Sequence, residues 1–324
     1  MIRTRAYRNG VCEHKDFDPA QISDCLAEAD AVVWMDVTEP TQTEFDLIAE
    51  EFSLNPLAVE DAASAGQRPK LDHYDDHVFI SLYDVALDRT TGELNSVELS
   101  VFASPRYLIT VRKNPRFDMN DVVQRWDETG HLAKHGVGFL LWGLLDVVVD
   151  GHFETVQHLD DEIEALEDLL FDDRPRAPEV QRRSFELRKS LVMLRRVVLP
   201  TREVLNALMR RELDVVDAEL MPYYQDVYDH VLRATDWTDS LRDLVSTILE
   251  TNLTIQGNRM NEIMKAVTSW AAIAAVPTVI TGYYGMNVRI FPGASSLTGG
   301  LVAIALMVVG VAVLYRLFKA RDWL

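Results

Sequence analysis

The stretch "TGYYGMNVRIF" places an uncharged tripeptide, Gly285-Met286-Asn287, between two long segments that carry no charge. An amide side chain and backbone carbonyls offer oxygen atoms that can accept hydrogen bonds without a full negative charge. The formal net charge of the chain is -19, yet this stretch contains no carboxylate. The role of an uncharged amide here depends on the segments on either side of it.

Two membrane spans are predicted on either side of the tripeptide. Residues 266–288 contain no charged residue, and neither do residues 290–315. Each run meets the roughly 20 residues needed to cross a bilayer. We therefore expect spans at 266–288 and 297–317, with a loop at 289–296 and a basic tail at 318–324. A buried soluble hairpin is the alternative, although the second run is apolar on every face.

Basic residues flank the two spans unequally. Arg259 and Lys265 precede the first span and three basic residues follow the second, whereas the loop has only Arg289. The positive-inside rule then places both ends of the chain in the cytoplasm. The shorter apolar run at residues 137–149 is too short to span and contains Asp146, which indicates a buried core helix.

A stripe of polar or small residues runs along the helix that contains the first span. Its members lie three, four or seven residues apart and so share one helix face: Asn261, Thr268, Ala271, Ala275, Thr278 and Gly282. Several copies around an axis would turn this stripe into stacked rings that could line a pore. A helix-packing face is the alternative, since small residues are enriched at membrane interfaces. The spacing leaves both interpretations open.

Composition narrows the class of protein. Lys and Arg total 32 against 51 Asp and Glu, a balance that repels nucleic acids and attracts cations. Cys12 and Cys25 are too few for a disulfide framework or a four-ligand zinc site. The sequence has no phosphate-binding glycine loop and no nucleophile elbow, so we expect no enzymatic activity, no nucleotide and no organic cofactor.

The remainder of the chain is predicted to be cytoplasmic. Residues 1–135 read as an α/β domain, with a helix at 41–54, a turn at Pro105 and Arg106, and strands at 31–37, 77–87, 97–103 and 107–113. Residues 136–221 read as a helical hairpin and residues 222–265 as a stalk helix that continues into the first span, since no proline occurs between Pro222 and Pro277.

Opposite charges occupy the two arms of the hairpin. Residues 146–173 hold eleven acidic residues, and residues 182–211 hold nine basic ones. An antiparallel arrangement would set acid against base, although two solvated faces explain most of these charges equally well. The sequence "HYDDH" at residues 73–77 has metal-like spacing, but its place before a strand favours a polar turn.

Three motifs together resemble the CorA family of magnesium transporters. They are the tripeptide after Tyr284 in the penultimate span, "NPLAVEDAASAGQRPK" at residues 55–70, and "YYQDVYDHV" at residues 223–231. Their order and the two C-terminal spans extend the resemblance over the whole chain. The resemblance implies a homopentameric funnel in the membrane lipid, in which five copies of the first span line the pore and the second span lies outside.

The resemblance also implies roles for individual residues. Gly285, Met286 and Asn287 match the selectivity filter, where a ring of amides would bind Mg²⁺ through its water shell; carboxylates would hold the ion too tightly for it to leave. Asn261 matches a lower polar ring, Met264 and Val267 match a hydrophobic constriction, and Thr278 matches a hydroxyl ring. Ala275 departs from the bulkier apolar residue that is common in relatives, and the loop with Arg289 departs from their acidic loop.

Regulatory carboxylates are implied as well. Asp61 and Asp226 match two acids that bind a regulatory divalent ion between adjacent subunits, and Glu250 matches a second acidic position. Asp226 precedes the membrane by about 60 Å of helix, so it is no pore ligand. An occupied site would hold the pentamer closed, and an empty one would favour opening.

We therefore predict a divalent cation channel of the inner (plasma) membrane that takes up Mg²⁺, with Co²⁺ and Ni²⁺ as further candidates, driven by the membrane potential. One alternative is a zinc transporter on the same scaffold, which Met286 disfavours. The other is a membrane-anchored sensor or scaffold that binds divalent cations without conducting them.

Overall fold

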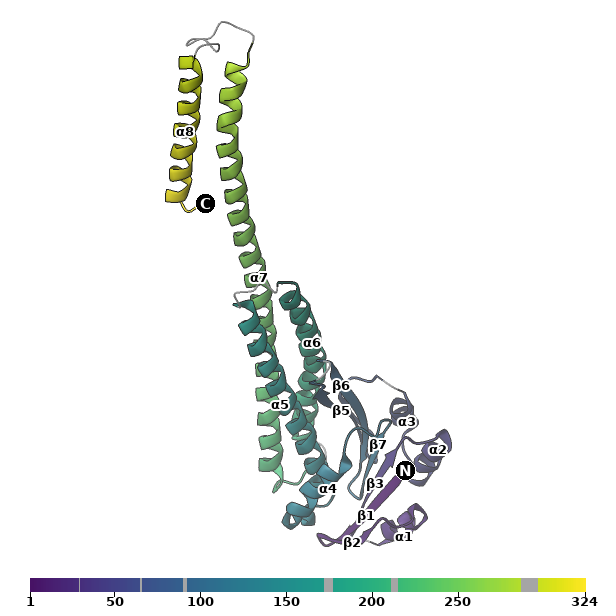
Figure 1. Cartoon of the computed structure of the whole chain (residues 1–324). Coiled ribbons are helices and arrows are strands. Elements are labelled where there is room, and N and C mark those ends of the chain that lie inside the picture. The colour runs from purple at the N-terminus through teal and green to yellow at the C-terminus, as the bar shows by residue number, and fades with distance from the viewer. Residues whose placement is uncertain (29, 65, 90–91, 172–176, 211–214, 287–296) are drawn as a thin grey trace. The chain divides into compact units, whose positions relative to one another are not determined.

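The computed structural model (Figure 1) describes residues 1–28, 30–64, 66–89, 92–171, 177–210, 215–286 and 297–324. The chain forms two compact units, Met1–Ile248 and Leu249–Leu324. Helix α7, Met221–Tyr284, contributes its first part to one unit and the rest to the other.

A seven-stranded mixed sheet is the centre of the first unit. Its strand order is β2-β1-β3-β7-β6-β5-β4, and only β3 and β7 pair in parallel among these neighbours. The strands are β1 Ile2–Arg8, β2 Val11–Lys15, β3 Ala31–Thr38, β4 Lys70–His73, β5 Val78–Leu87, β6 Leu94–Ala103 and β7 Tyr107–Arg112. The four predicted strands are confirmed, as is the turn between β6 and β7; β1, β2 and β4 were not predicted.

Helices cover both faces of this sheet (Figure 1). One layer holds α1 Ile22–Ala27, α2 Gln42–Glu51 and α3 Pro56–Ala63, and the other holds α4 Met119–Glu128, α5 Val137–Leu170, α6 Ala177–Leu208 and the first part of α7. Side chains alternate between the two layers along β3: Val33 and Met35 pack in the first core and Trp34 packs in the second. Two short 3₁₀ turns, Pro19–Gln21 and Gly130–His135, connect elements.

Capping residues determine where the helices of the first layer begin. The Thr41 hydroxyl accepts a hydrogen bond from the Glu44 backbone amide, and the Glu44 carboxylate accepts one from Thr41 in return, which is a capping box. The predicted helix at 41–54 thus begins one residue later and ends at Glu51. Asn55 then caps α3 by accepting from the Leu57 amide.

A buried ion pair joins the parallel strands β3 and β7. Asp36 is fully buried and accepts hydrogen bonds from Arg112 Nε at 3.0 Å and from the Thr110 hydroxyl at 2.8 Å. Arg112 also donates to the Phe117 carbonyl at 2.6 Å. Because every charged atom of the pair has partners, the pair can remain in the core.

The helical hairpin packs partly through charge. Arg183 on α6 donates to Glu162 on α5 at 2.8 Å, which sets acid against base as expected. Arg195 pairs instead with Asp239 on α7 at 2.7 Å. The run at residues 137–149 lies in α5, and most of its side chains are buried in the core.

The second unit contains the two membrane-type helices. They are the later part of α7 and α8 Leu297–Ala320, and both helices are long and apolar enough to cross a bilayer. Helix α7 has no break between the predicted stalk and the predicted first span, so the single continuous helix expected there is observed. Helix α8 begins at the predicted start of the second span and continues through Lys319.

The close contact between α4 and α5 gives a stability prediction. A Cβ added at Gly143 on α5 would lie 2.5 Å from the Trp126 indole of α4, whereas one added at Gly130 would meet nothing within 4 Å. We expect Gly143→Ala to lower the free energy of unfolding by about 1–3 kcal/mol through overpacking. Gly130→Ala should stay within about 0.5 kcal/mol of the wild type. Urea unfolding of the full chain in detergent, followed by tryptophan fluorescence, measures both, and equal values would contradict this packing.

Candidate functional site

The predicted stripe on α7 is exposed along its whole length. Its six members are exposed: Asn261, Thr268, Ala271, Ala275, Thr278 and Gly282. Met264 and Val267, the residues of the predicted constriction, are 55% and 57% exposed. None of these eight residues is buried by the part of the chain that the structure describes.

The other face of α7 packs against α8. Ser269 and Ile273 are buried, and a Cβ added at Gly310 of α8 would lie 2.9 Å from Val276 Cγ1. Gly299 and Ala303 of α8 are buried as well. At about 100° per residue, this packing face lies roughly opposite the stripe. Within the chain, the small residues of the stripe are not the ones that pack against α8.

The stripe presents oxygen atoms of moderate strength. The Thr278 hydroxyl donates to the Ala274 carbonyl at 3.0 Å, so its own oxygen lone pairs remain available as acceptors. The Thr281 hydroxyl donates to the Pro277 carbonyl at 2.8 Å; at about 100° per residue, Thr281 lies about 60° around the helix from Thr278, beyond the edge of the stripe. Hydroxyl oxygens of this kind suit water molecules around a cation better than the bare ion.

The tripeptide stands at the end of α7. The Gly285 amide donates to the Thr281 carbonyl at 2.8 Å, and the Met286 amide donates to the Tyr283 carbonyl at 3.3 Å. A Cβ at position 285 would lie 3.0 Å from the Thr281 carbonyl, so glycine suits this close approach. Met286 is 56% exposed. Asn287 and Arg289 lie outside the described residues.

A cavity of about 550 Å³ lies at the other end of the stripe. It is lined by Asn258, Asn261, Glu262, Met264, Lys265, Thr268 and Trp323. The Trp323 ring stacks on Phe318 with a centroid distance of 5.7 Å. The C-terminal residues therefore lie beside the part of α7 that carries the predicted lower polar ring.

The predicted regulatory carboxylates lie apart within one chain. Asp61 is on α3 and Asp226 is on α7, so the two lie in the layers on opposite sides of the sheet (Figure 1). The Asp226 side chain is exposed, and Glu250 is exposed on the part of α7 in the second unit. A cation shared by Asp61 and Asp226 would therefore need carboxylates from two chains.

Asp61 already has a cationic partner in the chain. Its Oδ2 atom accepts a hydrogen bond from Lys70 Nζ at 2.6 Å, and Asp72 Oδ2 lies 2.6 Å from the same nitrogen. The Asp61 side chain is 24% exposed. Asp226, in contrast, forms no ion pair with any residue in the described ranges.

The "HYDDH" sequence forms a turn between β4 and β5. The Tyr74 amide donates to the His77 carbonyl at 2.9 Å, which confirms the predicted turn. The His77 ring is buried and stacked on Tyr74, and burial lowers its pKa. Throughout the part of the chain that the structure describes, no group of three or more His, Cys, Asp or Glu residues is placed to hold a metal ion.

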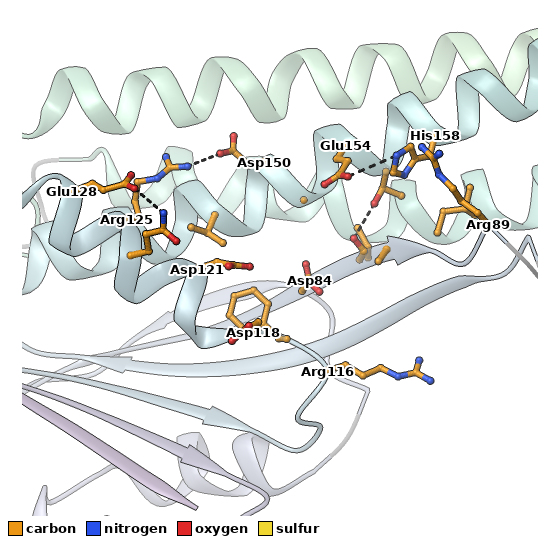
Figure 2. Close-up of a pocket in the computed structure, with 18 residues that line it drawn as sticks. Asp84, Arg89, Arg116, Asp118, Asp121, Arg125, Glu128, Asp150, Glu154 and His158 are labelled. Atoms are coloured by element: carbon orange, nitrogen blue, oxygen red, sulfur yellow. Dashed lines mark hydrogen bonds and ion pairs between the residues drawn. The ribbon is translucent and has the colours of Figure 1, made fainter. Parts of the chain in front are cut away.

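A second cavity, of about 690 Å³, lies between β5, α4 and α5 (Figure 2). Asp84, Asp121, Asp150 and Glu154 line it, and Arg125 donates to Asp150 at 3.0 Å. Burial, together with the charges of Asp121 and Glu154, raises the pKa of Asp84 to about 6, although a backbone hydrogen bond from Val85 lowers it in part. This cavity was not predicted; the signal in the sequence was an aspartate within the apolar strand "FISLYDVAL".

A glycine permits the approach of Asp84 to α5. A Cβ added at Gly151 would lie 3.1 Å from Asp84 Oδ1. The neighbouring His152 is fully buried, and its Nε2 donates to the Tyr83 carbonyl at 2.7 Å. Burial lowers the pKa of His152 to about 4, so at neutral pH this ring contributes no charge beside the cavity.

Comparisons with known proteins agree on one family. The model of the family described as "CorA-like Mg2+ transporter protein" matches residues 29–320. The cobalt/magnesium transport protein CorA of Thermotoga maritima is 32% identical over 96% of this chain and 90% of its own length. The zinc transport protein ZntB of Yersinia pestis is 23% identical over 93% of this chain and 90% of its own length.

A solved structure shows the same fold. The structure of the CorA magnesium transporter from Methanocaldococcus jannaschii matches with a TM-score of 0.80 and 24% identity, covering 99% of this chain and 98% of that one. The α/β domain, the long helix and the two membrane-type helices are therefore the arrangement of a solved transporter.

The raised pKa of Asp84 gives a prediction for stability against pH. The folded chain holds this proton more tightly than the unfolded chain, so Asp84 weakens folding increasingly as the pH rises from about 4 to above 6. Asp84→Asn removes this penalty. Its stability relative to the wild type should increase over that range by at most about 3 kcal/mol and then level off.

Urea unfolding at a series of pH values measures this difference. Asp168→Asn, at an exposed position on α5, removes one surface charge and is the matched control. Parallel pH profiles for the two variants would contradict the role of burial at Asp84.

Proposed function

This chain belongs to the family of CorA-like Mg²⁺ transporter proteins and is a divalent metal transporter, and we propose that it takes up Mg²⁺ as a homopentameric channel. Five copies of α7 line the ion path with their exposed stripes. Helix α8 lies on the outside, against the lipid. Co²⁺ and Ni²⁺ are further candidate ions.

The observation that carries this proposal is the division of α7 into two faces. The face with Ile273 and Val276 is used by α8, whereas the stripe with Asn261 and Thr278 is left open. Hydrocarbon solvates amides and hydroxyls poorly, so these side chains favour a position around a shared aqueous path. Five stripes supply stacked rings of amide, methyl and hydroxyl groups.

The chemistry of the rings fits a hydrated ion. Mg²⁺ holds its first-shell waters tightly, and neutral oxygens can accept hydrogen bonds from those waters. The ring of Asn287 forms the selectivity filter with Gly285 and Met286, and Met264 with Val267 forms the constriction. The membrane potential supplies about 4.6 kcal/mol per 100 mV for a divalent cation, so uptake needs no nucleotide.

Regulation occurs at carboxylates in the cytoplasmic part. Asp61 of one subunit and Asp226 of the next hold a regulatory Mg²⁺, with Glu250 as a second acidic position. The separation of Asp61 and Asp226 into different layers of one chain supports a site between chains. Both termini lie in the cytoplasm and the protein resides in the inner (plasma) membrane, as the flanking basic residues indicate.

Zinc transport on the same scaffold is the second candidate. A zinc transport protein is among the relatives, at 23% identity. Zinc favours histidine and cysteine ligands, and the stripe has neither. A sensor that does not conduct would have no need of a polar face that continues through the first span.

The first test of function concerns the filter. We expect Asn287→Ala to reduce Mg²⁺ flux into liposomes by about tenfold or more, because the ring of amides that receives the hydrated ion is lost. Thr281→Ala also removes one polar group, one turn before the tripeptide and off the stripe, and should retain most of the flux. Loss of flux in both variants, or in neither, would count against this filter.

The second test concerns the regulatory site. Flux through the wild type should fall as internal Mg²⁺ rises, because the occupied site holds the channel closed. Asp226→Ala should remain conducting at internal Mg²⁺ concentrations that close the wild type. If wild-type protein binds Mg²⁺ but shows no flux at any concentration, the non-conducting sensor replaces this proposal.

A further inference from the structure

The ammonium group of Lys70 occupies the position of a cation at Asp61. Its Nζ atom lies 2.6 Å from Asp61 Oδ2 and 2.6 Å from Asp72 Oδ2, and 5.7 Å from the centre of the Phe79 ring. The Lys70 side chain is 25% exposed. One positive charge thus joins two carboxylates, one at α3 and one on β4.

The environment keeps this group charged. Two carboxylate oxygens lie 2.6 Å from Lys70 Nζ and stabilise its positive charge through charge-assisted hydrogen bonds. The ammonium therefore neutralises part of the charge on Asp61. A divalent cation that approaches Asp61 meets a carboxylate that is already paired.

We propose that Lys70 is an internal competitor that weakens the binding of the regulatory divalent cation at Asp61 and so raises the Mg²⁺ concentration at which the site fills. This inference rests on the proposed regulatory role of Asp61. When the ion arrives, the ammonium leaves Asp61 and keeps Asp72 as its partner. Because the second partner is already in place, the exchange does not leave the lysine without a counterion.

A nearby lysine provides a matched control. Lys113 Nζ donates to the backbone carbonyl of Ser64, at the end of α3, and not to a carboxylate. Replacing either lysine removes one positive charge from the neighbourhood of α3. A general charge effect would be similar for both, whereas competition for Asp61 belongs to Lys70 alone.

The experiment is a Mg²⁺ titration of the full-length purified protein in detergent, with protection from limited proteolysis as the readout. We expect Lys70→Met to lower the half-saturating Mg²⁺ concentration by about two- to fivefold, the range of a partly exposed ion pair. Methionine at this position preserves an unbranched apolar side chain over the Phe79 ring. Lys113→Met should change the half-saturating Mg²⁺ concentration by less than about half of the change that Lys70→Met causes. Lys70→Arg retains the charge and should resemble the wild type. Lys70→Gln is a second neutral variant should Lys70→Met fail to fold.

Asp61→Asn separates this inference from the proposed function. If Asp61→Asn leaves the titration unchanged, the regulatory role of Asp61 fails and the inference fails with it. If Asp61→Asn weakens Mg²⁺ binding but neither neutral Lys70 variant strengthens it, only the competitor role is overturned. If Lys70 is the competitor, adding Asp61→Asn to Lys70→Met should abolish the decrease in the half-saturating Mg²⁺ concentration.

Discussion

Hydrocarbon cannot satisfy the polar groups of a membrane helix, and the second unit is organised around this constraint. Helix α7 forms its backbone hydrogen bonds within the helix, but it carries amide and hydroxyl side chains on one side. Helix α8 packs on the opposite side through small residues such as Gly310. The described residues leave the polar side exposed, which is the condition under which a single helix can contribute to an ion path.

The first unit holds charged groups in fixed positions on a packed sheet. The sheet lies between two helical layers, and the buried pair of Asp36 and Arg112 joins its parallel strands. Asp61 and Asp226 project from different layers. The carboxylates of this unit differ with their surroundings, since Asp61 is paired with Lys70 and burial raises the pKa of Asp84. The electrostatics of this unit therefore depends on neighbouring groups as well as on net charge.

Periodic features were predictable from the sequence, and features that depend on tertiary approach were not. The stripe and the continuous α7 follow from spacing and from the absence of proline. Strand β2 escaped prediction because it is a short, largely polar edge strand, and β1 because its buried Arg5 is paired with Asp127, which hides the apolar alternation. The cavity at Asp84 needs Gly151 on a helix distant in sequence. Asp61 and Lys70 stand in one recognised motif, yet the motif alone did not predict that their side chains form an ion pair at 2.6 Å.

Thiol accessibility tests most directly whether the stripe of α7 faces the ion path. In a background with Cys12 and Cys25 replaced by serine, cysteine is introduced at Thr278 on the stripe or at Ser269, which is buried on the opposite face of α7. Mg²⁺ flux into liposomes is then measured before and after a hydrophilic thiol reagent. We expect the reagent to block flux through Thr278→Cys and to leave Ser269→Cys conducting. Block at Ser269→Cys alone, or equal effects at both positions, would contradict this assignment.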